Sequence, residues 1–281
     1  MATGNRDDEG RAGRASEPLG ELAQPTSPPG RVSAAFFDLD RTLMSGSSGF
    51  FWARAAARAG MISRRRLALD AWENVKFRLR GSTDENTDKV MQRVGEMLIG
   101  KRALDFQRLG PQVLAGVLPR LYPQMLEIAW QHQDAGRPVF IVTAATQDTA
   151  AMIAHVLGFD GGLGTPLEAV DGLYTGRLAG PFAYRDGKPQ LIRELAAQRG
   201  LDLAESYAYS DSESDLPMLR AVGHPVAVNP DGTLSRVARE EGWDVLRFDR
   251  LGGRLKMMGG LAAATVLGAA GATARRRGLG K

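Results

Sequence analysis

The stretch AAFFDLDRTL, residues 34–43, indicates the class of fold. Its first four residues are apolar, which is typical of a strand that is buried on both faces. The run ends in two carboxylates one residue apart, Asp38 and Asp40, with a hydroxyl at Thr42. Open α/β folds bind ligands beyond the carboxyl ends of such strands, so we expect the functional site here. The alternative is a buried strand followed by an acidic turn without a function.

Four polar residues further along the chain follow apolar runs or begin helices. They are Thr143 after the run 138–142, Lys188 before a helix predicted over 190–199, and Asp211 and Asp215 after the run 206–210. A helix start is unfavourable for a cation, so Lys188 indicates a nearby anion. Parallel strands bring their carboxyl ends to one crevice, and alternating strands and helices indicate a doubly wound parallel sheet. These residues are therefore expected to lie close to Asp38.

This series of motifs resembles the haloacid dehalogenase superfamily of phosphohydrolases. The similar segments are residues 37–43, 141–144, 188 and 210–219, for the first to fourth motifs of that family. The long interval between the first two motifs resembles the subfamily that carries a helical cap there and includes the phosphoserine phosphatases. The resemblance covers residues 33–247 and implies an α/β fold with a Rossmann-like core and an inserted helical cap.

The residues of these motifs suit phosphoryl transfer. A carboxylate can attack a phosphate monoester if a divalent cation offsets the repulsion between their charges, and we assign this attack to Asp38. Asp40 can protonate the leaving group and later activate a water. The Thr143 hydroxyl and the Lys188 ammonium would bind the phosphoryl oxygens.

Magnesium is the cation that these residues suit, because it prefers oxygen ligands and retains several waters. We expect it on the carboxylates of Asp38 and Asp211 and on the backbone carbonyl of Asp40. Asp215 would orient this cluster without binding the metal.

Each assignment has a plainer alternative. Thr143 suits a strand simply because it is β-branched. A lysine such as Lys188 is usually solvated, and Arg185 competes for its role. Asp211 and Asp215 are also common types of helix N-cap.

The expected function is hydrolysis of a small phosphomonoester through an aspartyl phosphate. A phosphotransferase with the same intermediate is an alternative, and so is a non-enzymatic regulatory protein, although such a protein would normally lack the nucleophile or a metal acid. In phosphoserine phosphatases a glutamate stands at the position of Ser47 and an asparagine at that of Ser214, and Arg41 replaces a small residue. These departures argue against phosphoserine, which remains an alternative substrate.

Composition agrees with a globular enzyme. The 281 residues are 43% hydrophobic, which is ordinary for a folded domain. The net charge is +4, but the basic residues are dispersed or lie at the C-terminus, and no basic stripe is interleaved with aromatics, so we expect no nucleic-acid partner. The absence of cysteine excludes disulfides, zinc thiolates and thiol catalysis.

Composition shifts divide the chain into segments. We expect a disordered tail over 1–31, a core over 32–44 and 137–249, a helical cap over 45–136, and a basic Ala/Gly-rich tail over 250–281. The aromatic residues 50–52 are expected to pack inside the cap. Asp171-Gly172, between β-formers, predicts a hairpin. Further expected elements are a helix over 146–157 that stops at Gly158, a strand over 225–228, a helix over 231–241 and a strand over 243–246.

The C-terminal tail contains an uncharged stretch over 257–274, with basic residues on both sides. Its 18 residues only just reach the length that spans a bilayer, and most of them are small. A membrane anchor and an interfacial Ala/Gly helix both stay open. The first thirty residues lack the apolar core of a signal peptide. We therefore expect a cytoplasmic protein, membrane-associated if this stretch binds lipid, and the oligomeric state stays open.

Overall fold

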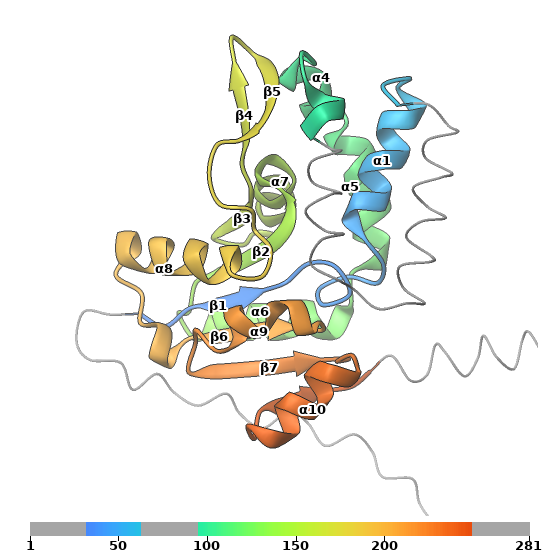
Figure 1. Cartoon of the computed structure of the whole chain (residues 1–281). Coiled ribbons are helices and arrows are strands. Elements are labelled where there is room, and N and C mark those ends of the chain that lie inside the picture. The colour runs from blue at the N-terminus through green and yellow to red at the C-terminus, as the bar shows by residue number, and fades with distance from the viewer. Residues whose placement is uncertain (1–31, 63–94, 249–281) are drawn as a thin grey trace, which may run out of the picture.

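The computed structural model describes residues 32–62 and 95–248 of the chain. Its main sheet has six parallel strands in the order β3-β2-β1-β6-β7-β8 (Figure 1). They are β1 (Ala35–Phe37), β2 (Val139–Thr146), β3 (Gly161–Thr165), β6 (Tyr207–Ser210), β7 (His224–Val228) and β8 (Asp244–Leu246). β1 pairs with β2 on one side and β6 on the other, and all of its residues are buried, as its apolar composition predicts. The strand order reverses at β1, which places a ligand crevice beyond its carboxyl end.

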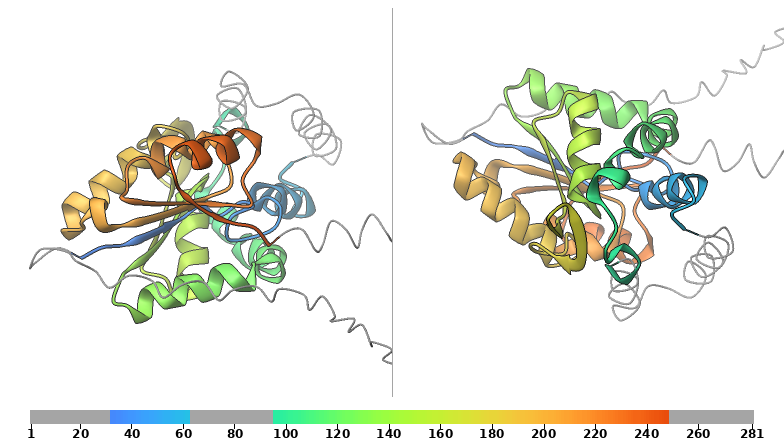
Figure 2. Two further views of the ribbon diagram at one scale, coloured as in Figure 1. Left: turned by 90° about the horizontal axis from the view of Figure 1, so that it is seen from below. Right: turned by 90° about the horizontal axis from the view of Figure 1, so that it is seen from above.

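Helices cover both faces of this sheet, which confirms the doubly wound architecture (Figure 2). One face packs against α6 (Pro123–Asp134) and α7 (Gln147–Leu157), and the other against α8 (Gly187–Arg199), α9 (Leu216–Leu219) and α10 (Gly232–Glu240). Successive side chains of a strand point to opposite faces. Phe37 therefore packs with the α6–α7 layer, while Phe36 stacks on Phe140 in the other core.

The edge strand β3 is not predicted from the sequence, because its segment GGLGT has three glycines and glycine disfavours strands. Close packing explains these glycines. A Cβ at Gly162 would lie 2.2 Å from the backbone oxygen of Ala150, and one at Gly164 would lie 2.7 Å from that of Thr146. Helix α7 and the end of β2 thus approach β3 too closely for any side chain at these positions.

The predicted hairpin is confirmed as β4 (Leu167–Val170) and β5 (Leu173–Leu178), which pair antiparallel. Its turn residues Asp171 and Gly172 have φ of 51° and 76°, the left-handed conformation that a tight hairpin turn requires. The hairpin is attached to the segment before α4 (Ala103–Gln107), because the Tyr174 amide donates to Lys101 O and the Gly100 amide donates to Tyr174 O. The expected position of this hairpin as a flap beside the site stays a prediction.

Other expected elements also form. Helix α7 ends at Gly158, whose φ is 70°, and β7, α10 and β8 lie within one or two residues of the expected ranges. Strand β2 is longer than predicted and continues through Thr143 to Thr146. This extension follows from pairing with β3, which reaches Thr146 opposite Thr165.

Between β1 and β2 the chain forms α1 (Ser48–Arg58), α4, α5 (Gly110–Val117) and the short turn η1 (Leu118–Arg120). A Cβ at Gly116 of α5 would lie 2.3 Å from the Phe51 ring, so α1 and α5 pack closely. Trp52 stacks on Phe106 with their ring centroids 5.1 Å apart. Phe51 and Trp52 therefore pack inside this helical part, whereas Phe50 is about half exposed.

The expected cap ends at residue 136 and so includes helix α6. The structure differs, because α6 packs against the sheet. Its buried residue His132 contacts Phe37 of β1 and bonds to Tyr209 of β6. We therefore propose that the cap ends near residue 122 and that α6 belongs to the core. The expected tails 1–31 and 250–281, the stretch 257–274 and residues 63–94 of the expected helical cap lie outside the described residues. Within the described ranges, no helix is long and apolar enough to cross a membrane.

Candidate active site

Strand pairing brings three of the predicted residues to one edge of the sheet. In the parallel register Phe37 is opposite Ile141 of β2 and Tyr209 of β6. Asp38 follows Phe37 directly, so Thr143 and Asp211 flank it, each one residue further along its own strand. The carboxyl ends of the central strands thus meet at Asp38, as the sequence predicts.

Lys188 lies at the start of α8, and its side chain reaches the same edge of the sheet. Its Nζ lies 2.7 Å from Asp38 Oδ1 and 2.6 Å from Asp215 Oδ2. The side chain of Lys188 is only 3% exposed, so the solvated alternative is wrong. The competing Arg185 lies instead against the ring of Tyr184, at 5.8 Å from its centroid.

Asp215 fixes Lys188 and does not cap a helix. One of its oxygens, Oδ2, accepts hydrogen bonds from both Lys188 Nζ and the hydroxyl of Ser210, the latter at 2.7 Å. Asp215 precedes α9 without any side-chain bond to that helix. Ser210 was not expected to contribute; a hydroxyl at the last position of a buried strand is the signal that points to it.

Asp38 has one fixed oxygen and one open oxygen. Oδ1 accepts from Lys188, whereas Oδ2 makes no hydrogen bond or ion pair to any described residue. Burial, together with the nearby carboxylates of Asp215 and Asp211, raises the pKa of Asp38 to about 8, and Lys188 opposes this rise. Burial alone would lower the pKa of Lys188, but Asp215 and Asp38 raise it above its ordinary value. Three acidic side chains, those of Asp38, Asp211 and Asp215, thus lie close enough to one buried lysine to influence one another.

Asp40 is directed toward the helical segment that follows. Its Oδ1 accepts the backbone amide of Ser48 at 2.8 Å, and its Oδ2 accepts the Ser47 hydroxyl at 3.0 Å. Burial raises the pKa of Asp40, and the bonds from Ser48 and Ser47 oppose this rise. The carboxylate thus caps the first turn of α1, a contact that the sequence did not indicate.

Asp211 is held at both oxygens. Its Oδ2 lies 2.9 Å from Arg41 Nε, and its Oδ1 accepts the Thr42 hydroxyl at 3.5 Å. Burial raises the pKa of Asp211 to about 6, and Arg41 opposes this rise. Asp211 is not a helix cap, because the short turn after it is capped by Ser212.

Thr143 is buried in β2, and its Oγ1 accepts the amide of Ala145 at 3.2 Å. This bond leaves the hydroxyl proton of Thr143 available to another acceptor. No contact joins Thr143 to the carboxylates described above, so its expected role toward phosphate stays a prediction.

The donor set fits a hard divalent cation. Within the described residues no three histidine, cysteine or acidic side chains group to hold a metal. The expected set needs only two side chains, Asp38 and Asp211, because Asp40 would contribute its backbone carbonyl while its carboxylate caps α1. All of these donors are oxygens and the two side chains are buried, and a bound cation would offset the repulsion from Asp211 that contributes to the raised pKa of Asp38.

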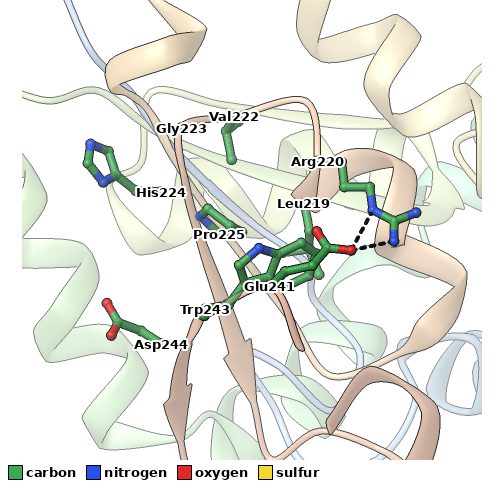
Figure 3. A pocket seen from close by; sticks show the side chains of 10 residues that line it. Leu219, Arg220, Val222, Gly223, His224, Pro225, Glu241, Trp243 and Asp244 are labelled. Carbon is green, nitrogen blue, oxygen red and sulfur yellow. Dashed lines mark hydrogen bonds and ion pairs between the residues drawn. The ribbon is translucent and has the colours of Figure 1, made fainter. Parts of the chain in front are cut away.

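A separate surface hollow of about 410 Å³ lies at the other end of the strands (Figure 3). It is lined by Trp243, His224 at the start of β7 and Asp244 at the start of β8, with the Arg220–Glu241 ion pair beside them. None of the predicted site residues lines it. The hollow is therefore distinct from the edge where Asp38 lies.

Comparison with known proteins identifies the family of this chain. Residues 35–220 match the family of haloacid dehalogenase-like hydrolases. The chain belongs to this family and is a phosphohydrolase.

Two curated relatives and one solved structure illustrate the similarity. The chain is 37% identical over 250 residues to phosphoserine phosphatase SerB1 of Mycobacterium tuberculosis, covering 88% of this chain and 81% of that protein. It is 32% identical over 223 residues to the histidinol-phosphatase of Neisseria meningitidis serogroup C, covering 76% and 98%. The crystal structure of a protein with unknown function from Bordetella pertussis Tohama I has a TM-score of 0.68 and 32% identity, covering 77% of this chain and 98% of that one.

Proposed function

We propose that this chain is a magnesium-dependent phosphatase that hydrolyses a small phosphomonoester through an aspartyl phosphate on Asp38. The proposal depends on one observation, the different bonding of the two oxygens of the Asp38 carboxylate. Lys188 holds Oδ1 at 2.7 Å, and Oδ2 makes no bond to a described residue. A buried carboxylate with one fixed and one open oxygen is oriented for attack on phosphorus.

In the first step Asp38 Oδ2 forms a bond to the phosphorus and the bond to the ester oxygen breaks. The leaving alkoxide takes a proton from Asp40, whose buried carboxyl has a raised pKa and can be protonated. In the second step Asp40 takes a proton from water, and the resulting hydroxide attacks the aspartyl phosphate. Inorganic phosphate leaves and the Asp38 carboxylate is restored.

Lys188 and Thr143 are the proposed partners of the phosphoryl oxygens, Lys188 by its charge and Thr143 by its available hydroxyl proton. Asp215 and Ser210 hold Lys188 in place. Magnesium, held by Asp38, Asp211 and the carbonyl of Asp40, would supply the positive charge that offsets the repulsion between nucleophile and phosphate.

The substrate is proposed to be a small phosphate ester other than phosphoserine. Phosphoserine phosphatases have a glutamate at the position of Ser47, and a carboxylate there would suit a substrate ammonium group. Here Ser47 is neutral, and its hydroxyl is bonded to Asp40. The similarity to a phosphoserine phosphatase and a histidinol-phosphatase supports phosphatase chemistry. Phosphoserine and histidinol phosphate must therefore be among the substrates tested.

A phosphate-release assay with and without magnesium tests this function. The panel contains phosphoserine, histidinol phosphate and small phosphate esters without an ammonium group. We expect magnesium-dependent release that is fastest with an ester lacking the ammonium. Phosphoserine as the best substrate would overturn the substrate assignment, and no release from any ester would overturn the activity. Adding acceptor alcohols separates the alternative phosphotransferase, which would give new phosphate esters in place of inorganic phosphate.

A further inference from the structure

Arg41 lies between the proposed proton donor Asp40 and Thr42, in an unusual backbone conformation. Its φ is 68°, in the left-handed region that favours glycine or asparagine. A long charged side chain at this position is held against that preference. Its contact with Asp211 provides a reason, because Arg41 Nε lies 2.9 Å from Asp211 Oδ2.

The two side chains of the Arg41–Asp211 ion pair differ strongly in their exposure to solvent. The Arg41 side chain is 51% exposed, whereas that of Asp211 is 7% exposed. Arg41 therefore reaches a buried carboxylate from the solvent side of the site. The closest approach of the pair is Nε to Oδ2, and no hydrogen bond is formed between these two side chains, so the pair is weaker than the hydrogen-bonded fork that arginine can form with a carboxylate.

Lys188 provides the contrast within the same cluster. It is almost fully buried and lies within 2.7 Å of both Asp38 and Asp215. Two short contacts and burial make Lys188 a permanent counter-ion, because its removal would leave buried carboxylates unpaired. Arg41 has one contact and retains access to water, so it can leave at little cost.

We propose that Arg41 is a displaceable counter-ion that occupies Asp211 until a divalent cation binds. This inference rests on the proposed function, in which Asp211 is a metal ligand. Arg41 stabilises the buried carboxylate when the cation is absent, and the cation must displace it from Oδ2. Thr42 keeps its bond to Oδ1, so the carboxylate stays oriented during the exchange. Arg41 therefore weakens cation binding and makes Asp211 selective for ions that attract a carboxylate more strongly than one guanidinium contact does.

Calorimetric titration of Mg²⁺ into the full chain, without substrate, tests this proposal by binding alone. Arg41→Gln keeps the length of the side chain and removes its charge, and glutamine does not relieve the left-handed backbone as glycine would. We expect this variant to bind Mg²⁺ about fivefold more tightly than the wild type, the scale of one partly exposed ion pair. Unchanged or weaker binding would overturn the proposal, provided that circular dichroism shows a wild-type fold. If the fold is lost, Arg41→Asn is titrated instead and must bind Mg²⁺ more tightly, because asparagine removes the charge and tolerates the left-handed backbone.

Two control variants separate this proposal from its premise. Arg220→Gln removes the same charge from an exposed pair with Glu241, at the distant hollow of Figure 3. Equal tightening in Arg220→Gln and Arg41→Gln would show an effect of net charge and overturn the proposal. Asp211→Asn should abolish the binding. If Asp211→Asn binds Mg²⁺ as the wild type does, the metal site of the proposed function is wrong, and Arg41 has no role in it.

Discussion

Lys188 Nζ lies 2.7 Å from Asp38 Oδ1 although the two residues are 150 positions apart in the chain. The same nitrogen lies 2.6 Å from Asp215 Oδ2, so one buried ammonium links β1, α8 and the turn after β6. This contact ties the orientation of the proposed nucleophile to the packing of the core. We therefore expect that Lys188 contributes to both the activity and the stability of the protein.

Replacing Lys188 by Met should lower kcat/KM about a hundredfold or more, because a charged donor to the phosphoryl group is lost. The same change should destabilise the fold by about 3 kcal/mol, since Asp38 and Asp215 remain buried without their cation. Urea unfolding measures the second effect. Asp215→Asn added to Lys188→Met should recover part of the lost stability, because it removes one of the unpaired charges. A double variant that is less stable by the sum of the two single losses would contradict this coupling.

Ser47→Ala should raise the pKa of Asp40, because the Ser47 hydroxyl stabilises the ionised carboxylate at 3.0 Å. Asp40 must be protonated for the first step, so the limb on which kcat/KM falls as Asp40 ionises should move to higher pH. Ser45→Ala is the matched control, since the Ser45 hydroxyl donates to the backbone of Arg120. Identical profiles for Ser47→Ala and the wild type would show that this bond does not tune Asp40.

His132 predicts a pH dependence of stability. Arg137 Nε donates to His132 Nδ1 at 2.8 Å, so the neutral ring carries its proton on Nε2, which lies 2.8 Å from the Tyr209 hydroxyl. Burial, together with the charge of Arg137, lowers the pKa of His132 from 6.5 to about 3.

Between these values the unfolded chain takes up a proton that the folded protein does not, so stability falls as the pH falls from 6.5 toward 3. His132→Gln should reduce this loss by about 1.4 kcal/mol per pH unit. Urea unfolding at pH 6 and pH 5 measures the slope for both proteins. Equal slopes would mean that His132 is already protonated in the fold.

Gly162→Ala should destabilise the protein by about 1–3 kcal/mol, because the new Cβ would lie 2.2 Å from the Ala150 oxygen. Gly161→Ala in the same strand is the matched control, since its Cβ would meet only the Phe140 ring, at 3.3 Å. Chemical denaturation compares the two variants. Equal losses would indicate that glycine flexibility, and not the contact with α7, determines the effect.

The strands and helices that the sequence predicts are those with strong local signals. The apolar run before Asp38 and the Asp171-Gly172 turn each specify their own structure within a few residues. Strand β3 has no such signal, because its glycines are required by the neighbouring helix α7. The position of α6 depends on contacts with Phe37 and Tyr209, which no local pattern reveals.

In the site, too, only the features with a clear sequence signal could be predicted. The strand-end positions of Asp38 and Asp211 follow from the parallel fold, and the unfavourable helix start of Lys188 correctly indicates an anion. The partners of Asp40 and Asp211 did not follow, because Ser48 and Arg41 are brought to them by the path of a single loop. Side-chain direction within a loop is a property of tertiary structure.

Asp38 is the proposed nucleophile, so the turnover of Asp38→Asn is the decisive experiment. Phosphate release with magnesium is measured for this variant, for the wild type and for Asp134→Asn, which changes an exposed acid at the far end of α6. We expect a loss of at least about a thousandfold in Asp38→Asn and wild-type turnover in Asp134→Asn. Magnesium-dependent turnover that survives in Asp38→Asn would show that Asp38 is not the nucleophile.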